Sequence, residues 1–172
     1  MANVVTSAYS DNEAGSTSYS VVSGSAVLSN STDFAVTGSK SLKAVAGNGS
    51  PFKAGSAYSD RFPVSSSTLY EFSMYIRSSV SMWVDWGVDF YNAGGSYVTT
   101  AVFGGAMSNT VAFSQFVDST TTDSTATSFT IWIQGNPSGS GEVLYMDLYV
   151  ADIPGPAPTG AHRMLAFFPG GF

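Results

Sequence analysis

Two alternating runs joined by a loop of turn formers constrain the fold of this chain most strongly. In residues 128–134 the apolar set is Phe129, Ile131 and Ile133, and the opposite set is Thr130, Trp132 and Gln134. In residues 143–150 the corresponding sets are Leu144, Met146, Leu148 and Val150, and Tyr145, Asp147 and Tyr149. A period of two is typical of a strand with one buried face. With Gly, Ser, Asn and Pro between the runs, the pattern predicts an antiparallel hairpin.

Similar short runs recur along the rest of the chain, and no window shows a helical period. We predict nine strands, over residues 19–28, 41–46, 57–64, 69–77, 81–91, 97–103, 111–117, 128–134 and 143–150. This number and spacing indicate an all-β fold, a two-sheet antiparallel β-sandwich or jelly roll. The more apolar set of each strand should face the core, because a slip of one residue would bury carboxylates.

The composition excludes several classes of function. The chain is 14% aromatic and only 10% charged, the reverse of a disordered chain. Its net charge of −6 and six scattered Lys and Arg residues disfavour nucleic acid as a partner, since phosphate binding needs a basic patch. There is no Cys for disulfides or thiolate chemistry, and no apolar run reaches membrane-spanning length. The lack of Cys predicts assembly in a reducing cytosol, and residues 1–5 do not show the features of a secretory signal.

The chain divides into a domain over residues 1–152 and a Pro-rich spacer with an apolar tail over residues 153–172. Pro154, Pro156 and Pro158 predict an extended spacer. The large apolar side chains of the tail are Leu165, Phe167, Phe168 and Phe172. We expect them to dock on a neighbouring subunit or the capsid shell, because burial of each contributes about 1.5–3 kcal/mol. The alternative is a tail that covers the open end of its own sandwich.

A family resemblance is carried by residues 33–43, Asp33-Phe34-Ala35-Val36-Thr37-Gly38-Ser39-Lys40-Ser41-Leu42-Lys43. This segment resembles the "H/F-x-G-x-x-S-L-K/R" segment of galactose-binding-like jelly rolls, a superfamily that includes many carbohydrate-binding modules. Asn12-Glu13, residues 70–77 and residues 144–147 match further features in the expected order, so that the resemblance covers about residues 10–152. It implies a two-sheet jelly roll, commonly with a structural calcium ion and sometimes with glycan binding on the concave sheet. Such domains also occur in tailed-phage virion proteins.

The resemblance implies Glu13, Lys40 and Asp147 as the residues of the calcium (Ca²⁺) site. Calcium prefers six to eight oxygen ligands with carboxylates among them. The family usually has an Asp-Asp pair in the last strand, whereas this chain has Asp147-Leu148. The alternative interpretation is a hydrogen-bonded Asp147 that ties the last strand to the first loop.

Candidate glycan contacts come from the faces that we expect to lie opposite the core. A glycan site combines aromatic rings, which stack on sugars, with carboxylates and amides, which bind hydroxyl groups. The candidates are Tyr75, Trp83, Asp85, Asp89, Tyr91, Trp132 and Gln134. The alternative is that these aromatic residues pack across strands or in subunit interfaces, where Trp and Tyr are also common.

Catalysis has little support in the sequence. The one histidine, His162, lies in the tail, and Asp85 and Asp89 are about 13 Å apart along one strand. The carboxylate pair of a glycosidase needs a separation of about 5–9.5 Å. We therefore expect a non-enzymatic protein.

The leading hypothesis is a bacteriophage virion structural protein, a capsid decoration or tail-associated subunit. Its partners would be the major capsid or tail protein and copies of itself, and it could present a glycan-binding face to host glycans. The alternative is a carbohydrate-binding module or lectin that recognises cell-surface or polysaccharide glycans.

Overall fold

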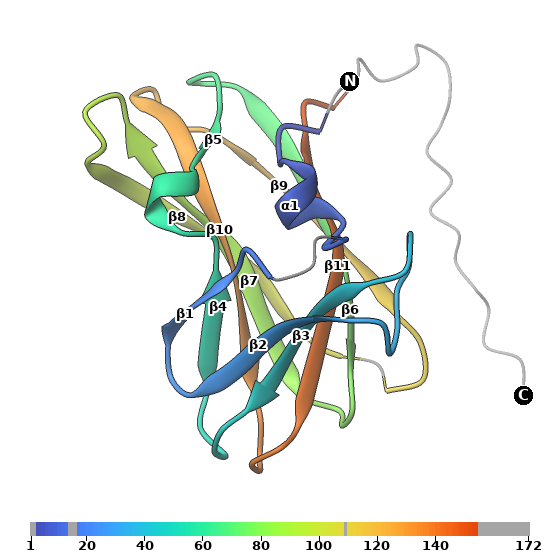
Figure 1. The fold of residues 1–172 in the computed structure, drawn as a ribbon. Helices are drawn as coiled ribbons and strands as arrows, with labels where there is room; N and C mark the ends of the chain where they lie inside the picture. The colour runs from blue at the N-terminus through green and yellow to red at the C-terminus, as the bar shows by residue number, and fades with distance from the viewer. Residues whose placement is uncertain (1–2, 14–16, 109, 155–172) are drawn as a thin grey trace, which may run out of the picture.

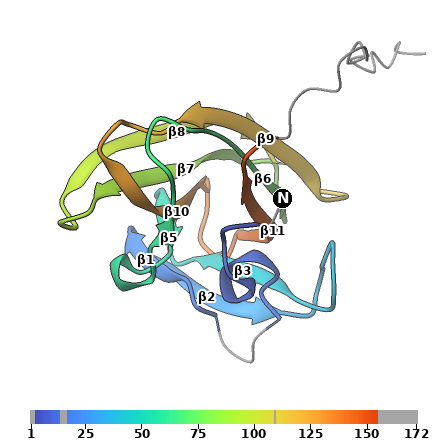
Figure 2. The ribbon, with the colours of Figure 1, turned by 90° about the horizontal axis from the view of Figure 1, so that it is seen from above.

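The computed structural model describes residues 3–13, 17–108 and 110–154. Within them the chain forms two antiparallel sheets packed face to face (Figure 1, Figure 2). The predicted all-β, two-sheet sandwich is confirmed. The docking prediction for Leu165, Phe167, Phe168 and Phe172 lies outside the described residues.

Sheet A and sheet B contain strands from all parts of the described chain. Sheet A has the order β1 (Ser20–Ser23), β4 (Phe52–Gly55), β10 (Ala126–Asn136), β7 (Trp83–Asn92) and β8 (Tyr97–Met107), with β5 (Phe62–Pro63) also paired to β10. Sheet B has the order β2 (Ala26–Ser31), β3 (Ser41–Ala46), β11 (Val143–Asp152), β6 (Leu69–Ser78) and β9 (Ser114–Thr121). Strands β8 and β9 therefore each end a sheet.

The predicted hairpin between residues 128–134 and 143–150 is wrong. Strand β10 pairs with β4, β5 and β7 in sheet A, whereas β11 pairs with β3 and β6 in sheet B. The connecting loop therefore crosses from one sheet to the other. Both strands carry apolar sets, and these sets meet face to face across the core instead of lying side by side in one sheet.

Other strand bounds also differ from the prediction. Residues 19–28 form two strands in different sheets, and the turn between them contains Gly24. Residues 57–64 form the 3-10 helix η1 (Tyr58–Asp60) followed by the short β5, and the sequence patterns missed β4. They also missed helix α1 (Ser7–Ser10), which lies beside β11 (Figure 1). Among the described helices, none has the length and apolar character of a membrane span.

The core lies between the sheets and is rich in aromatic rings. The predicted inward sets of β6 and β7 are confirmed, since Phe72, Met74 and Ile76 are fully buried and Trp86 is 1% exposed. The ring of Trp86 lies 4.6 Å from that of Phe103, measured between centroids. These contacts fix which face of each strand is left for solvent.

Strand β11 follows the predicted alternation only as far as Asp147. The pairing with β6 shifts between Asp147 and Val150, and Leu148 has a φ of 51°. This bulge adds one residue to the strand and so reverses the faces that follow it. Tyr149 is therefore in the core, and Val150 is only half-buried. The predicted orientation of residues 148–150 is wrong.

Candidate glycan-binding face and the Glu13–Asp147 loop site

Six of the seven candidate glycan contacts lie on one surface, which we call the sheet A face. Trp83, Asp85, Asp89 and Tyr91 project from β7 on the side opposite the core. The paired strand β10 adds Trp132, which lies opposite Gly87, and Gln134, which lies opposite Asp85. Tyr75 lies on β6 in sheet B, so the structure separates it from the others. The sheet A face extends for about 26 Å between Trp83 and Tyr91.

One end of this face is an exposed indole surrounded by amides. Trp83 is 47% exposed, and its Nε1 donates to Asp85 Oδ1 (3.0 Å). Asn136 Nδ2 donates to Asp85 Oδ2 (3.3 Å), and Gln134 Nε2 donates to Asn136 Oδ1 (3.3 Å). Asn136 was missed by the sequence reasoning, although it lies two residues after Gln134 and so shares its face. The side chains hold one another in place and leave the indole open.

The centre of the face is occupied by Trp132, which a lysine covers. Lys53 Nζ lies 4.0 Å from the centroid of the Trp132 ring and 3.8 Å from Asp89 Oδ2. The indole is only 6% exposed, and its Nε1 has no hydrogen-bond partner among the described residues. A Cβ at Gly87 would lie 2.6 Å from Trp132 Cζ2, so the ring can lie here only because residue 87 is glycine.

The other end of the face is a group of tyrosines around an arginine. The rings of Tyr58 and Tyr91 lie 5.0 Å apart, and those of Tyr91 and Tyr97 lie 6.2 Å apart. Arg61 Cζ lies 4.3 Å from the Tyr58 ring centroid, and Tyr58 and Tyr97 are more than half exposed. A pocket of about 190 Å³ lies between this group and Trp132. The sequence reasoning missed Tyr58, because it placed this residue in a strand.

The residues implied for calcium meet at the loop over residues 33–40. Glu13 Oε1 accepts hydrogen bonds from the backbone N–H groups of Ser39 (2.7 Å) and Lys40 (2.8 Å). The Lys40 side chain donates to the carbonyl oxygen of Glu13 (3.0 Å). Gly38 has a φ of 61°, and a Cβ there would lie 2.3 Å from Glu13 Oε1. The sequence segment around Gly38 therefore wraps closely around a carboxylate.

Asp147 anchors the same loop from β11. Its Oδ2 accepts hydrogen bonds from the backbone N–H groups of Val36 (2.7 Å) and Thr37 (3.1 Å). The side chain is fully buried, and burial raises the pKa of Asp147 even though these hydrogen bonds lower it in part. The negative charge of Glu13 raises this pKa further. The hydrogen bonds to Glu13, that from Ser39 foremost, lower its own pKa.

A calcium ion at Glu13, Lys40 and Asp147 stays a prediction. All four oxygens of the two carboxylates accept hydrogen bonds from backbone N–H groups or a hydroxyl group of the chain. The described residues contain no group of three or more His, Cys, Asp and Glu side chains suited to a metal ion, so other oxygens would have to complete the site. Asn12 Oδ1 is such an oxygen, since it is buried without a hydrogen-bond partner among the described residues. Calcium accepts carboxylate, amide and backbone oxygens together. If calcium binds, Glu13, Asp147 and the predicted Lys40 position would hold it together with Asn12, and the ion would link the loop to β11.

Solved structures of other proteins have folds similar to that of this chain. No protein-family model matches the sequence, and no curated protein matches it. Among solved structures, the xylan-binding CBM22 domain from Paenibacillus barcinonensis has a TM-score of 0.65 at 12% identity, over 84% of this chain and 91% of that one. This chain therefore has a β-sandwich fold similar to that of this domain.

Two further structures extend the likeness. The CBM22 and GH10 modules of a Clostridium thermocellum xylanase, solved with xylohexaose, match with a TM-score of 0.67 at 11% identity, over 89% of this chain and 29% of that one. Tailspike protein 4 of bacteriophage CBA120 matches with a TM-score of 0.67 at 11% identity, over 88% of this chain and 21% of that one. At such identities the likeness shows the fold alone.

Proposed function

We propose that this chain is a non-catalytic carbohydrate-binding domain and that the sheet A face is its binding surface. The observation that carries the proposal is the gathering of exposed rings and amides on one face of a carbohydrate-binding-module fold. Trp83 lies at one end, Tyr58 and Tyr97 lie at the other, and Gln134 and Asn136 lie beside Trp83. Rings stack on the apolar faces of sugars, and amides bind their hydroxyl groups. An extended glycan would lie along β7.

The charges on this face favour a neutral glycan. Lys53 lies against Asp89, and Asp85 accepts hydrogen bonds from Trp83 and Asn136. The positive and negative groups therefore largely offset one another, and no strong field of either sign selects an ionised sugar. Lys53 also covers Trp132, so stacking on that ring requires the lysine side chain to move aside.

The same contacts support a binding role in place of catalysis. Asp85 and Asp89 hold neighbouring side chains, since Asp89 Oδ1 accepts a hydrogen bond from Thr100 (2.6 Å) and Asp85 is bonded as described above. Their separation along β7 also exceeds the distance that glycosidase carboxylates need. We infer that both aspartates position the binding face.

The experiment is affinity electrophoresis and calorimetry with soluble xylan, mixed-linkage glucan, glucomannan and bacterial capsular polysaccharides. Trp83→Ala should weaken binding roughly tenfold or more, because one stacked ring supplies on the order of 1–2 kcal/mol. Tyr75→Ala is the matched control, since Tyr75 is a half-buried aromatic residue on sheet B. It should bind as the unmodified protein does. Equal loss in both variants, or no binding to any glycan, would overturn the proposal.

A second candidate function is a structural subunit of a phage particle, and the tailspike likeness is the observation that favours it. In this proposal the domain is located in the virion, contacts the major capsid or tail protein and copies of itself, and turns its sheet A face toward host glycans. Residues 159–172, with Leu165, Phe167, Phe168 and Phe172, would dock it on the particle. Mass spectrometry of purified particles tests this, and absence of the protein from them would exclude it.

A further inference from the structure

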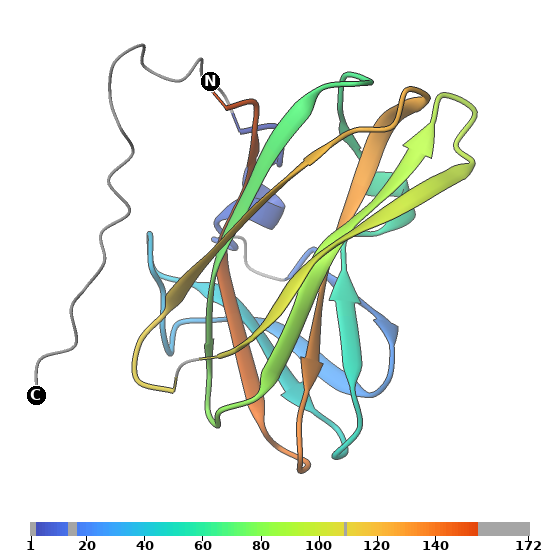
Figure 3. The same ribbon diagram turned by 180° about the vertical axis from the view of Figure 1, so that it is seen from behind.

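A second pocket lies away from the sheet A face, at the edge of the sandwich where β8 and β9 end the two sheets. These two strands run near each other on one side of the molecule (Figure 2, Figure 3). The pocket between them has a volume of about 420 Å³. This lies within the range of about 300–1,000 Å³ that is usual for ligand sites.

The strand registers explain why this space is left open. Thr99 and Ala101 pair with the core residues Phe90 and Val88, so their side chains lie on the core side of β8. Asp118 pairs with Phe72 in the same way and so lies on the core side of β9. Small or polar side chains thus occupy inward positions that large apolar residues fill elsewhere. The hydrophobic core therefore does not extend to the edge of the sandwich at β8 and β9.

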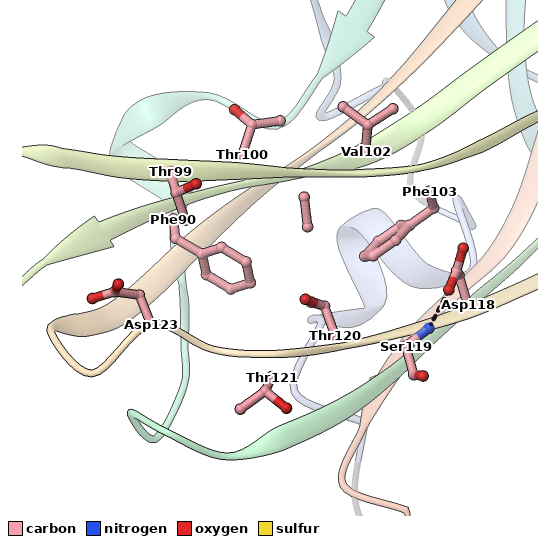
Figure 4. Close-up of a pocket in the computed structure, with 11 residues that line it drawn as sticks. Phe90, Thr99, Thr100, Val102, Phe103, Asp118, Ser119, Thr120, Thr121 and Asp123 are labelled. Atoms are coloured by element: carbon pink, nitrogen blue, oxygen red, sulfur yellow. Dashed lines mark hydrogen bonds between the residues drawn. The ribbon is translucent and has the colours of Figure 1, made fainter.

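The walls of the pocket combine rings, hydroxyl groups and carboxylates. Figure 4 shows the Phe90 and Phe103 rings with Thr120 between them and Asp118 and Asp123 toward opposite ends. Both rings are almost fully buried, so hydroxyl and carboxylate groups supply most of the accessible wall. Asp118 Oδ1 accepts a hydrogen bond from the backbone N–H of Ser119 (2.7 Å). Among the described residues, none of the side chains that line the pocket is positively charged.

An inward carboxylate on an edge strand also has a simpler use, since it discourages edge-to-edge pairing of sheets. That use explains Asp118 alone. It does not explain the space or the hydroxyl groups on both strands. Asp123 has a structural use of its own, since its Oδ1 accepts hydrogen bonds from the backbone N–H (2.8 Å) and hydroxyl group (2.7 Å) of Thr125. A ligand that suits these features has many hydroxyl groups to donate and no negative charge. Hydrogen bonds from such hydroxyl groups to a carboxylate are strong, because the acceptor is ionised.

We propose that this pocket is a second carbohydrate site, which takes one neutral sugar unit at the end of a chain. Asp118 accepts hydrogen bonds from the sugar hydroxyl groups, and Thr99 and Thr120 supply further hydrogen bonds. The site opens at the edge between the two sheets, so it suits a chain end, whereas the sheet A face suits the length of a chain. It requires no ligand on the sheet A face.

The test is a titration of the ¹⁵N-labelled protein with D-glucose, D-galactose, D-mannose, D-xylose and their methyl glycosides, followed by NMR. We expect saturable shifts at residues 99–103 and 118–123 with a dissociation constant in the millimolar range. Asp118→Ala and Thr120→Val should each weaken the binding, the former roughly tenfold or more. Glu71→Ala is the matched control, because Glu71 lies on the outer side of β6, next to β9.

The variant Trp83→Ala distinguishes a failure of this site from a failure of the proposed function. It should weaken or abolish binding on the sheet A face and leave the shifts at residues 99–103 and 118–123 unchanged. Shifts that map to the sheet A face, or Asp118→Ala binding as tightly as Glu71→Ala, would overturn the second site. It is equally overturned if no sugar of the panel causes shifts at β8 and β9. Shifts there with calcium chloride alone would assign the pocket to a cation instead.

Discussion

Two buried tyrosines show how a single hydroxyl group can matter to this core. Tyr19 and Tyr149 are both almost fully buried, and burial raises the pKa of each well above its ordinary value. Tyr19 Oη donates to the carbonyl oxygen of Tyr9 (2.8 Å). Tyr149 Oη has no hydrogen-bond partner among the described residues. Both side chains are therefore buried, but only the hydroxyl group of Tyr19 has a hydrogen-bond partner among the described residues.

Replacement of each tyrosine by phenylalanine should have opposite effects on stability. Tyr19→Phe removes a made hydrogen bond and leaves a buried carbonyl oxygen unpaired, so the free energy of unfolding should fall by about 1 kcal/mol or more. Tyr149→Phe removes a hydroxyl group that gains nothing from burial, so the free energy of unfolding should stay level or rise by about 1 kcal/mol. Urea denaturation of both variants measures this. A loss as large in Tyr149→Phe as in Tyr19→Phe would contradict it.

The sequence predicted single residues well where alternation alone decides their position. It placed Trp83, Asp85 and Trp132 on the side opposite the core, as the structure has them. It could not show that Lys53 covers Trp132, because Lys53 lies on β4, which the patterns missed, and the contact depends on the pairing of β4 with β10. It also could not separate Tyr75 from the other candidates, since periodicity gives a side chain's face and not its sheet.

At the scale of elements, strand faces were more predictable than strand partners. The apolar sets of β10 and β11 were identified correctly up to Met146, but the two strands belong to different sheets. A loop of turn formers is compatible with a hairpin and with a crossing between sheets, and only the packing of both apolar faces decides. The bulge at Leu148 left no sequence signal, because a positive φ is expected at glycine or asparagine and not at leucine.

Helix α1 supplies a prediction on alkaline stability. Tyr9 is buried, and its hydroxyl group donates to Oδ2 of Asp60 (2.6 Å), the last residue of η1. Burial, together with the charge and hydrogen bond of Asp60, raises the pKa of Tyr9 from 10.0 to about 12. Because the folded pKa is the higher one, the stabilisation is complete below about pH 10 and is lost as the pH rises through about 12.

The free energy of unfolding should therefore fall between about pH 10 and pH 12, and part of that slope should be absent from Tyr9→Phe. Denaturant titrations at a series of alkaline pH values measure the slope. Tyr58→Phe is the control, since Tyr58 is half exposed. An unchanged slope in Tyr9→Phe would show that other groups cause the loss.

At the scale of the whole molecule, the two candidate carbohydrate sites and the loop site use different parts of one sandwich. The sheet A face combines outward positions on β4, β7, β10 and the start of β8 with η1, and the second pocket lies where the core ends between β8 and β9. The Glu13–Asp147 loop site holds a loop of sheet B to β11. Because these contacts join segments that are far apart in sequence, loss of the loop site should weaken the whole domain and not one binding surface.

Calcium gives the test of that argument. If Glu13, Asp147 and Asn12 hold the ion, calcium binds the folded chain alone and stabilises it by about 2.7 kcal/mol at a hundred times its dissociation constant. For a domain of this size that corresponds to a melting temperature roughly 5–10 °C higher in calcium than in excess chelator. Glu13→Gln should abolish the difference, whereas Glu142→Gln, a change of another loop carboxylate, should preserve it. Identical melting curves with calcium and with chelator would mean that the hydrogen bonds to Val36, Thr37, Ser39 and Lys40 hold the loop without a metal ion.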